Sequence, residues 1–200
     1  MIDGSDYTLK TEKCYNFQYQ SQSVVYLNTN HYNTFIFNGV NEEIVLYYQP
    51  VIWGHQYNAN YNNGIKLVRS TSFGSDGRQS MRNAQWTPDY MIKLIRAGKE
   101  KYIILDAKYT DRRTFLRERM KDLVYKYMFA IQTLDNAEFL GGCYLYGKNY
   151  YTECRMVNIH DIYPIDSDGR MFWIVSLCEG RSNDTQQMNE LRKIIDVLKQ

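Results

Sequence analysis

The stretch that most constrains the fold of this chain is residues 86–109, WTPDYMIKLIRAGKEKYIILDAKY. Two runs rich in Ile, Leu and Tyr, residues 90–95 and 102–105, have the length and composition of β-strands. The polar residues between them, 96–100, include Gly98, a residue suited to a tight turn. The stretch therefore predicts an antiparallel hairpin.

Charged residues stand at the two ends of this hairpin that lie opposite the turn. Pro88 and Asp89 come directly before the first strand, and Asp106, Ala107 and Lys108 end the second. Antiparallel pairing would bring these ends together. Because side chains alternate along a strand, we expect Asp106 and Lys108 to share one face while Ala107 points into the packed layer.

This arrangement predicts a site for phosphodiester hydrolysis. The carboxylates of Asp89 and Asp106 and the carbonyl oxygen of Ala107 would form a set of hard oxygen ligands of the kind that Mg²⁺ prefers, completed by water and a phosphate oxygen. Lys108 would stand beside the attacking water, help to orient or deprotonate it, and balance charge on the phosphate. The predicted catalytic residues are Asp89, Asp106 and Lys108.

The same residues carry a resemblance to a known superfamily. Pro88-Asp89, sixteen intervening residues and Asp106-Ala107-Lys108 resemble the motif of the PD-(D/E)XK nucleases. The sequence TPDYMIKL…YIILDAKY is followed by a predicted long basic helix and further strands. This order is similar to that of the nuclease domain of McrC-like restriction and defence proteins. The resemblance implies an Mg²⁺- or Mn²⁺-dependent DNA endonuclease of a bacterial restriction or antiphage system, with an AAA+ GTPase or ATPase partner or a larger parent chain.

The resemblance also implies auxiliary residues. The core of these nucleases usually opens with a helix that carries a further glutamate to the metal, but residues 1–33 favour irregular β-structure. Either this helix lies upstream in a longer natural chain or the site lacks it, and the candidate substitutes are Glu12, Glu42 and Glu43, of which Glu43 lies on a predicted strand. Helices that follow the motif in related nucleases often supply Tyr, Gln or Lys. Tyr125, Lys126 and Tyr127 are therefore auxiliary candidates, although the chain has no QxxxY pattern there.

The clearest helix is predicted over residues 112–134, with Asp111 as its N-cap. Apolar residues recur along it at steps of three or four: Leu116, Met120, Leu123, Tyr127, Ile131 and Leu134. Between residues 112 and 126 it has six basic and two acidic residues, so its polar face would either hold a nucleic-acid backbone or simply be solvated. Together with two arginines of the long loop 70–85, the predicted DNA-binding residues are Arg78, Arg82, Arg112, Arg113, Arg117 and Lys126.

The remaining pattern predicts an α/β (α+β) fold in which helices flank a mixed central sheet, as in a restriction-endonuclease-like core. Further strands are expected at residues 35–37, 44–53, 65–69, 138–146 and 171–177, and a final amphipathic helix at 184–199 with Asp184 as its cap. We expect a β-rich extension over residues 1–33 and the nuclease-like domain over 34–200. The pair Gly141-Gly142 suggests close backbone packing.

Composition limits the other classes of function. The formal net charge is only +2, so nucleic-acid binding would depend on local patches. The four cysteines are widely spaced and favour neither a zinc site nor a disulfide framework. The chain has no apolar span near twenty residues and no P-loop, so we expect a cytoplasmic protein with no membrane association and no nucleotide-hydrolysing motor of its own.

A second interpretation belongs to a different class of protein. The absence of the expected opening helix and the tyrosine-rich N-terminal region favour a catalytically silent nucleic-acid-binding or assembly module with a nuclease fold. Cleavage of RNA instead of DNA, and a homodimeric state, also stay open at the level of sequence.

Overall fold

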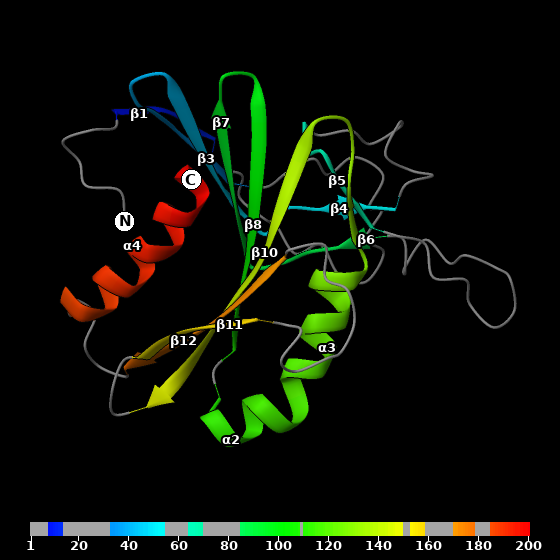
Figure 1. The fold of residues 1–200 in the computed structure, drawn as a ribbon, viewed down its shortest axis with the longest axis vertical. Coiled ribbons are helices and arrows are strands. Elements are labelled where there is room, and N and C mark those ends of the chain that lie inside the picture. Colours follow the sequence, from blue (N-terminus) through cyan, green and yellow to red (C-terminus); the bar gives the residue numbers. More distant parts are fainter. Residues whose placement is uncertain are drawn as a thin grey trace, which may run out of the picture.

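The computed structural model describes residues 8–13, 33–54, 64–69, 85–108, 110–149, 153–158, 170–178 and 185–200. Within this part the fold is a mixed α/β arrangement dominated by strands, with one large sheet between helical segments (Figure 1). The predicted α/β class is therefore confirmed at this level. No helix in the described ranges has both the length and the apolar character needed to span a bilayer.

The large sheet has eight strands. Their spatial order is β1 (Thr8–Lys13), β2 (Asn33–Asn38), β3 (Glu42–Tyr48), β7 (Tyr90–Arg96), β8 (Lys99–Lys108), β10 (Ala137–Asn149), β12 (Met171–Cys178) and β11 (Glu153–Asn158). The strands from β1 to β8 are antiparallel, β10 is parallel to both β8 and β12, and β11 is antiparallel at the edge. The sheet is mixed, as the sequence predicts.

Two small sheets complete the strand structure. One pairs β4 (Ile52–Trp53) with β6 (Gln85–Trp86), and the other pairs β5 (Leu67–Arg69) with β9 (Ile131–Thr133). The prediction of one continuous strand over residues 44–53 was wrong. The chain leaves the large sheet at Gln49, which has a φ of 51°, and then pairs with β6 instead.

The predicted hairpin is confirmed as β7 and β8, with a tighter turn than expected. The strands pair from Arg96 and Lys99 to Tyr90 and Leu105, so only residues 97 and 98 form the loop. Ala97 and Gly98 have φ values of 49° and 75°, and positive φ at both positions matches the twist of a two-residue hairpin turn.

A helical segment connects β8 to the parallel strand β10. It consists of α2 (Arg112–Thr114), η3 (Phe115–Arg119), α3 (Met120–Val124) and η4 (Tyr125–Phe129), in which α-type and π-type turns alternate. The capping prediction is confirmed, because the carboxylate of Asp111 accepts the backbone N–H of Thr114 at 3.0 Å. We call this segment the crossover helix.

The predicted end of this helix at residue 134 was wrong. The helix ends at Phe129, and residues 131–133 form β9, in which Ile131 and Thr133 have the branched side chains that favour strands. The predicted apolar stripe also missed Phe115 and Val124, which are buried. Because π-type turns bond i to i+5, residues along the helix rotate away from a strict period of 3.6.

The alternation of side chains on β7 and β8 divides the interior into two cores. On one face Met91, Tyr102 and Ile104 pack with residues of the crossover helix. On the other face Ile103 and Leu105 pack with residues of α4 (Thr185–Lys199). The two helices therefore lie on opposite faces of the hairpin (Figure 1).

Other predicted elements fall partly outside the described residues. The predicted strands at 138–146 and 171–177 and the last helix are confirmed by β10, β12 and α4. The described part of the N-terminal region, β1, pairs with β2 and so extends the large sheet. Arg78, Arg82 and the cap residue Asp184 lie outside the described residues.

Candidate active site

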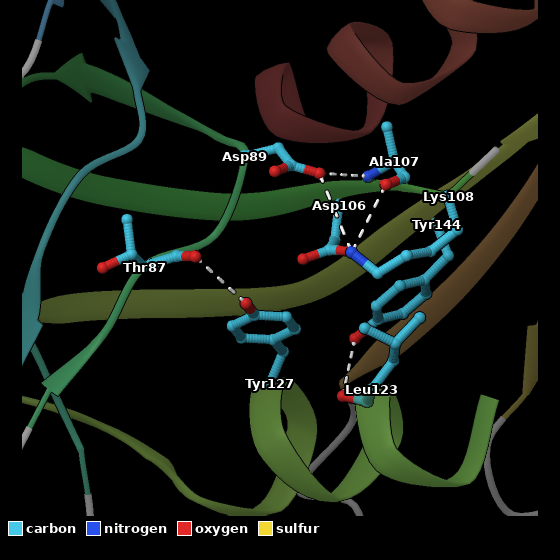
Figure 2. A network of polar contacts seen from close by, with 8 residues as sticks. All are labelled: Thr87, Asp89, Asp106, Ala107, Lys108, Leu123, Tyr127 and Tyr144. Atoms are coloured by element: carbon cyan, nitrogen blue, oxygen red, sulfur yellow. Dashed lines mark hydrogen bonds and ion pairs between the residues drawn. The ribbon is translucent and has the colours of Figure 1, made fainter. Parts of the chain in front are cut away.

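The structure brings Asp89 and Asp106 together at the open end of the β7–β8 hairpin (Figure 2). We call these two residues the acid pair. Asp89 comes directly before β7, and Asp106 lies near the end of β8. The carboxylate of Asp89 accepts the backbone N–H of Ala107 at 2.7 Å, so the two strand ends are tied together by a side chain.

The position of Asp89 follows from the local backbone. Pro88 is buried and lies between β6 and β7. Because it has no N–H to donate, the chain is not paired as a strand at this residue. The carbonyl of Asp89 accepts the N–H of Gln49 at 2.8 Å. Because the last backbone pair between β7 and β8 joins Tyr90 to Leu105, the N–H of Ala107 extends beyond the ladder, and the carboxylate of Asp89 satisfies it.

The ammonium of Lys108 lies among three oxygen atoms of this end. It donates to Oδ1 of Asp106 and to the carbonyl oxygen of Ala107 at 3.3 Å, and its Nζ lies 3.9 Å from Oδ2 of Asp89. The predicted common face of Asp106 and Lys108 is confirmed by their contact. The expectation that Ala107 points into the packed layer was wrong, because Ala107 is exposed beyond the paired part of the hairpin.

The acid pair is asymmetric in its exposure to solvent. The side chain of Asp106 is 4% exposed, whereas the side chains of Asp89 and Lys108 are 34% and 35% exposed. A buried carboxylate is costly unless charged or hydrogen-bonding partners compensate for the lost water. Asp106 is therefore the anchored member of the pair, and Asp89 faces the solvent side.

The crossover helix supplies a partner for the buried acid. Burial raises the pKa of Tyr127, and the negative charge of Asp106 and a hydrogen bond to its carboxylate raise it further. The Tyr127 hydroxyl also lies 3.4 Å from the carbonyl oxygen of Thr87, two residues before Asp89 (Figure 2). One phenol thus contacts both strand ends that carry the acids.

A second buried tyrosine holds the crossover helix against β10. The hydroxyl of Tyr144 donates to the carbonyl oxygen of Leu123 at 3.1 Å, and burial raises the pKa of this phenol. The Tyr144 ring lies over Gly142, where an added Cβ would stand 2.5 Å from the hydroxyl oxygen. The predicted close packing is therefore confirmed at Gly142. It lets Tyr144 reach Leu123 and so hold the crossover helix against β10.

Lys126 is the predicted DNA-binding residue that the structure links to the acid pair. Burial lowers the pKa of this lysine, the carboxylates of Asp106 and Asp89 raise it, and the cations of Lys108 and Arg69 lower it. Its Nζ lies 4.7 Å from the centre of the Tyr127 ring. Tyr125, one residue earlier, is 58% exposed.

Other predicted residues lie elsewhere. Glu43 pairs with Ile95, near the turn end of β7, whereas Asp89 adjoins the other end, where Tyr48 pairs with Tyr90. Five residues of strand separate the two pairs, a distance of roughly 17 Å. Arg113 and Arg117 are exposed on the first half of the crossover helix, and Arg112 begins it. The structure does not bring Glu43 to the acid pair.

The oxygen atoms around Lys108 are of the type that a divalent metal such as Mg²⁺ prefers. In the described residues no group of three or more His, Cys, Asp and Glu side chains is suited to hold a metal. The acid pair and the carbonyl of Ala107 nevertheless offer three hard oxygen atoms that already surround one cation. Mg²⁺ is commonly bound by one or two carboxylates and completed by water and substrate phosphates, so this donor set fits it.

Sequence reasoning missed two residues close to this site. The guanidinium of Arg69 lies over the Trp86 ring, with Cζ 4.6 Å from its centre, and Trp86 packs edge-on against Tyr127 at 6.1 Å between ring centres. Trp86 lies two residues before Pro88 of the Pro-Asp motif, and this closeness in sequence could have identified it. No such feature marks Arg69 in the sequence, because the residues that surround it come from distant segments of the chain.

Neither a scan of protein-family models nor a search of curated proteins found a match to this chain.

Proposed function

We propose that this chain is a metal-dependent nuclease that hydrolyses phosphodiester bonds in DNA. The observation that carries the proposal is the convergence of Asp89, Asp106 and Lys108 at the ends of two adjacent strands. The order of elements supports it, since the antiparallel strands β3, β7 and β8 are followed by a helical crossover to the parallel strand β10. This is the order expected of a restriction-endonuclease-like core.

In this proposal Asp89, Asp106 and the carbonyl of Ala107 hold Mg²⁺ or Mn²⁺. The ion would supply charge stabilisation for the attacked phosphate and a lower pKa for the attacking water. Asp106 keeps its position through burial and through Tyr127. Lys108 is close enough to the same oxygens to hold the attacking water or to donate to a phosphate oxygen as negative charge develops there.

The substrate and the setting follow from charge and from the resemblance. Arg113 and Arg117 are exposed on the first half of the crossover helix, and Lys126, in its last turn, lies near the acid pair, so a phosphate backbone that follows this helix would meet cations. The McrC-like pattern favours a cytoplasmic role in restriction or antiphage defence, with an AAA+ partner or a larger parent chain. These assignments are part of the proposal.

The test is cleavage of supercoiled plasmid DNA with Mg²⁺ or Mn²⁺ by the wild type and by Lys108→Ala. We expect metal-dependent nicking by the wild type and a loss of roughly 10²–10⁴-fold in the variant, the range for removal of a group that assists proton transfer. Lys99→Ala, at the turn end of β8, is the matched control and should cleave like the wild type. Equal nicking by wild type and Lys108→Ala would refute the assignment.

One observation favours a second candidate, a silent nucleic-acid-binding module. The ammonium of Lys108 already pairs with both acids, so a cation of the chain itself occupies the position between the carboxylates that a divalent ion would take. The two candidates differ in metal binding. A silent module should show no stabilisation by Mg²⁺ or Mn²⁺ and no cleavage, yet should still bind DNA.

A further inference from the structure

We propose that Arg69 is a substrate-binding residue, which holds a backbone phosphate next to the one that is hydrolysed at the acid pair. The class of ligand is the phosphodiester backbone of a nucleic acid, and the inference rests on the proposed function of the acid pair. Three observations carry it: the backbone that places Arg69, the ring that orients it, and the charges that surround it.

The backbone around Arg69 is fixed by three segments. Arg69 pairs with Ile131, two residues after the crossover helix ends, and also forms a parallel bridge with Gly54. Gly54 follows β4, and β4 pairs with β6, which contains Trp86. The segments that place Arg69 are therefore those that place Tyr127 and the Pro-Asp motif.

The Trp86 ring then orients the guanidinium. Arg69 Cζ lies 4.6 Å above the centre of the ring, and the arginine is half-buried. A guanidinium that stacks on an aromatic ring covers one flat face and directs its N–H groups outward in the ring plane, the geometry in which it binds phosphate oxygens. Contacts run without a gap from Arg69 through Trp86 and Tyr127 to Asp106.

The charges around the acid pair favour an anionic ligand. Arg69 and Lys108 both lower the pKa of Lys126, so each of them lies within electrostatic reach of Lys126. The carboxylates of Asp89 and Asp106 raise the same pKa, so Lys126 also lies within electrostatic reach of the acid pair. Like charges gathered in a half-buried region repel each other, and a bound phosphate relieves that repulsion.

The experiment compares wild type, Arg69→Gln, Arg69→Lys and Arg96→Gln in binding a short fluorescein-labelled DNA duplex in EDTA over a range of salt concentrations. Arg96 is an exposed arginine at the turn end of the same hairpin and serves as the control. We expect Arg69→Gln to weaken binding roughly 10-fold at low salt, as loss of a charged hydrogen bond does. It should also reduce the slope of log affinity against log salt by about 0.9.

Arg69→Lys should keep the slope, because the charge remains, and Arg96→Gln should behave as the wild type. Thermal unfolding of each variant shows whether loss of the stack on Trp86 has unfolded the protein. If Arg69→Gln fails to fold, Arg69→Lys still decides the question: as a phosphate ligand it must lose affinity, since a lysine cannot reproduce the planar two-pronged contact. Unchanged affinity and slope in a folded Arg69 variant would overturn the inference.

Cleavage assays separate this inference from the proposed function. If the wild type cleaves plasmid DNA while Arg69→Gln keeps the wild-type KM and salt slope, the nuclease stands and the role of Arg69 fails. If the wild type binds DNA without cleaving it and Arg69→Gln reduces the slope, the phosphate site stands and the hydrolysis fails. A wild type that binds no DNA duplex overturns both.

Discussion

The β7–β8 hairpin carries two clusters of acidic, lysine and tyrosine side chains, and only one of them is the candidate active site. The acid pair with Lys108 and Tyr127 occupies the open end. Toward the turn end, Glu100 accepts a hydrogen bond from the hydroxyl of Tyr102 at 2.5 Å and pairs with Lys66 at 3.6 Å. We call Glu100, Tyr102, Lys66 and Lys93 the Glu100 cluster.

The clusters differ in how many carboxylates converge and in what covers them. In the Glu100 cluster the hydroxyl of Tyr102 also accepts the backbone N–H of Lys66 at 3.1 Å, and Lys93 donates to the carbonyl oxygen of Gly64 at 3.4 Å. Glu100 is the one carboxylate of this cluster, and it pairs with Lys66 beside these contacts to the backbone of residues 64 and 66. At the acid pair two carboxylates face Lys108, and Asp89 is partly open to solvent. The candidate active site therefore differs from the Glu100 cluster in its second carboxylate and in its access to solvent, and less in its residue types.

The largest expected contrast is in cleavage. Asp106→Asn should reduce plasmid nicking by roughly 10²–10⁴-fold, because in the proposed mechanism it removes an anionic metal ligand beside the attacked phosphate. Glu100→Gln, an isosteric change in the other cluster, should leave the rate within a few-fold of the wild type. Initial rates at saturating Mg²⁺ provide the comparison, and an equal loss in both variants would erase the proposed distinction between the clusters.

Metal binding should separate the clusters next. A ligand that binds only the folded state at a hundred times its Kd stabilises it by about 2.7 kcal/mol, so Mn²⁺ should raise the Tm of the wild type and of Glu100→Gln. The doubly substituted Asp89→Asn, Asp106→Asn protein should show no such rise. Differential scanning fluorimetry with EDTA as the reference measures the shift, and a rise retained in the double variant would place the metal elsewhere.

The two tyrosines should differ in which property they support. Tyr127→Phe removes the hydroxyl that contacts Asp106 and should lower cleavage about 10-fold, beyond the cost of about 1 kcal/mol in unfolding free energy that a lost buried hydrogen bond carries. Tyr102→Phe leaves Glu100 and the N–H of Lys66 without that hydroxyl and should cost about 1 kcal/mol of unfolding free energy with little effect on rate. Nicking rate and urea unfolding are measured for both variants. Equal losses of nicking rate in Tyr127→Phe and Tyr102→Phe would contradict the different roles assigned to the two tyrosines.

The smallest expected effect concerns pH and Lys93. Burial lowers the pKa of Lys93, and the carboxylates of Glu100 and Glu43 only partly oppose this. Between the lowered pKa and the ordinary value near 10.5, the unfolded chain holds more protons at this residue than the folded one. Lys93 therefore contributes increasing stability as pH rises through that window. Urea unfolding of Lys93→Met should show a flatter dependence on pH there, and an unchanged dependence would exclude burial as the dominant cause.

Much of the local structure was predictable because it depends on neighbours in sequence. The apolar runs of β7 and β8, the glycine in their turn and the Asp111 cap all act over a few residues. The same is true of the shared face of Asp106 and Lys108. The end of the crossover helix was not predictable in this way, because residues 131–133 become a strand only by pairing with β5, which lies more than sixty residues earlier in the chain.

By itself, the sequence determined that one hairpin would place Asp89 opposite Asp106 and Lys108, since strand pairing and side-chain alternation follow from local composition. Only the tertiary structure decided that Asp106 is buried, that Tyr127 contacts it, and that Arg69 stacks on Trp86 beside it. The physical reason is that burial and electrostatics depend on which distant segments pack together. Packing brings β5, β6 and the crossover helix to one end of the sheet, and no spacing within any one of them records that contact.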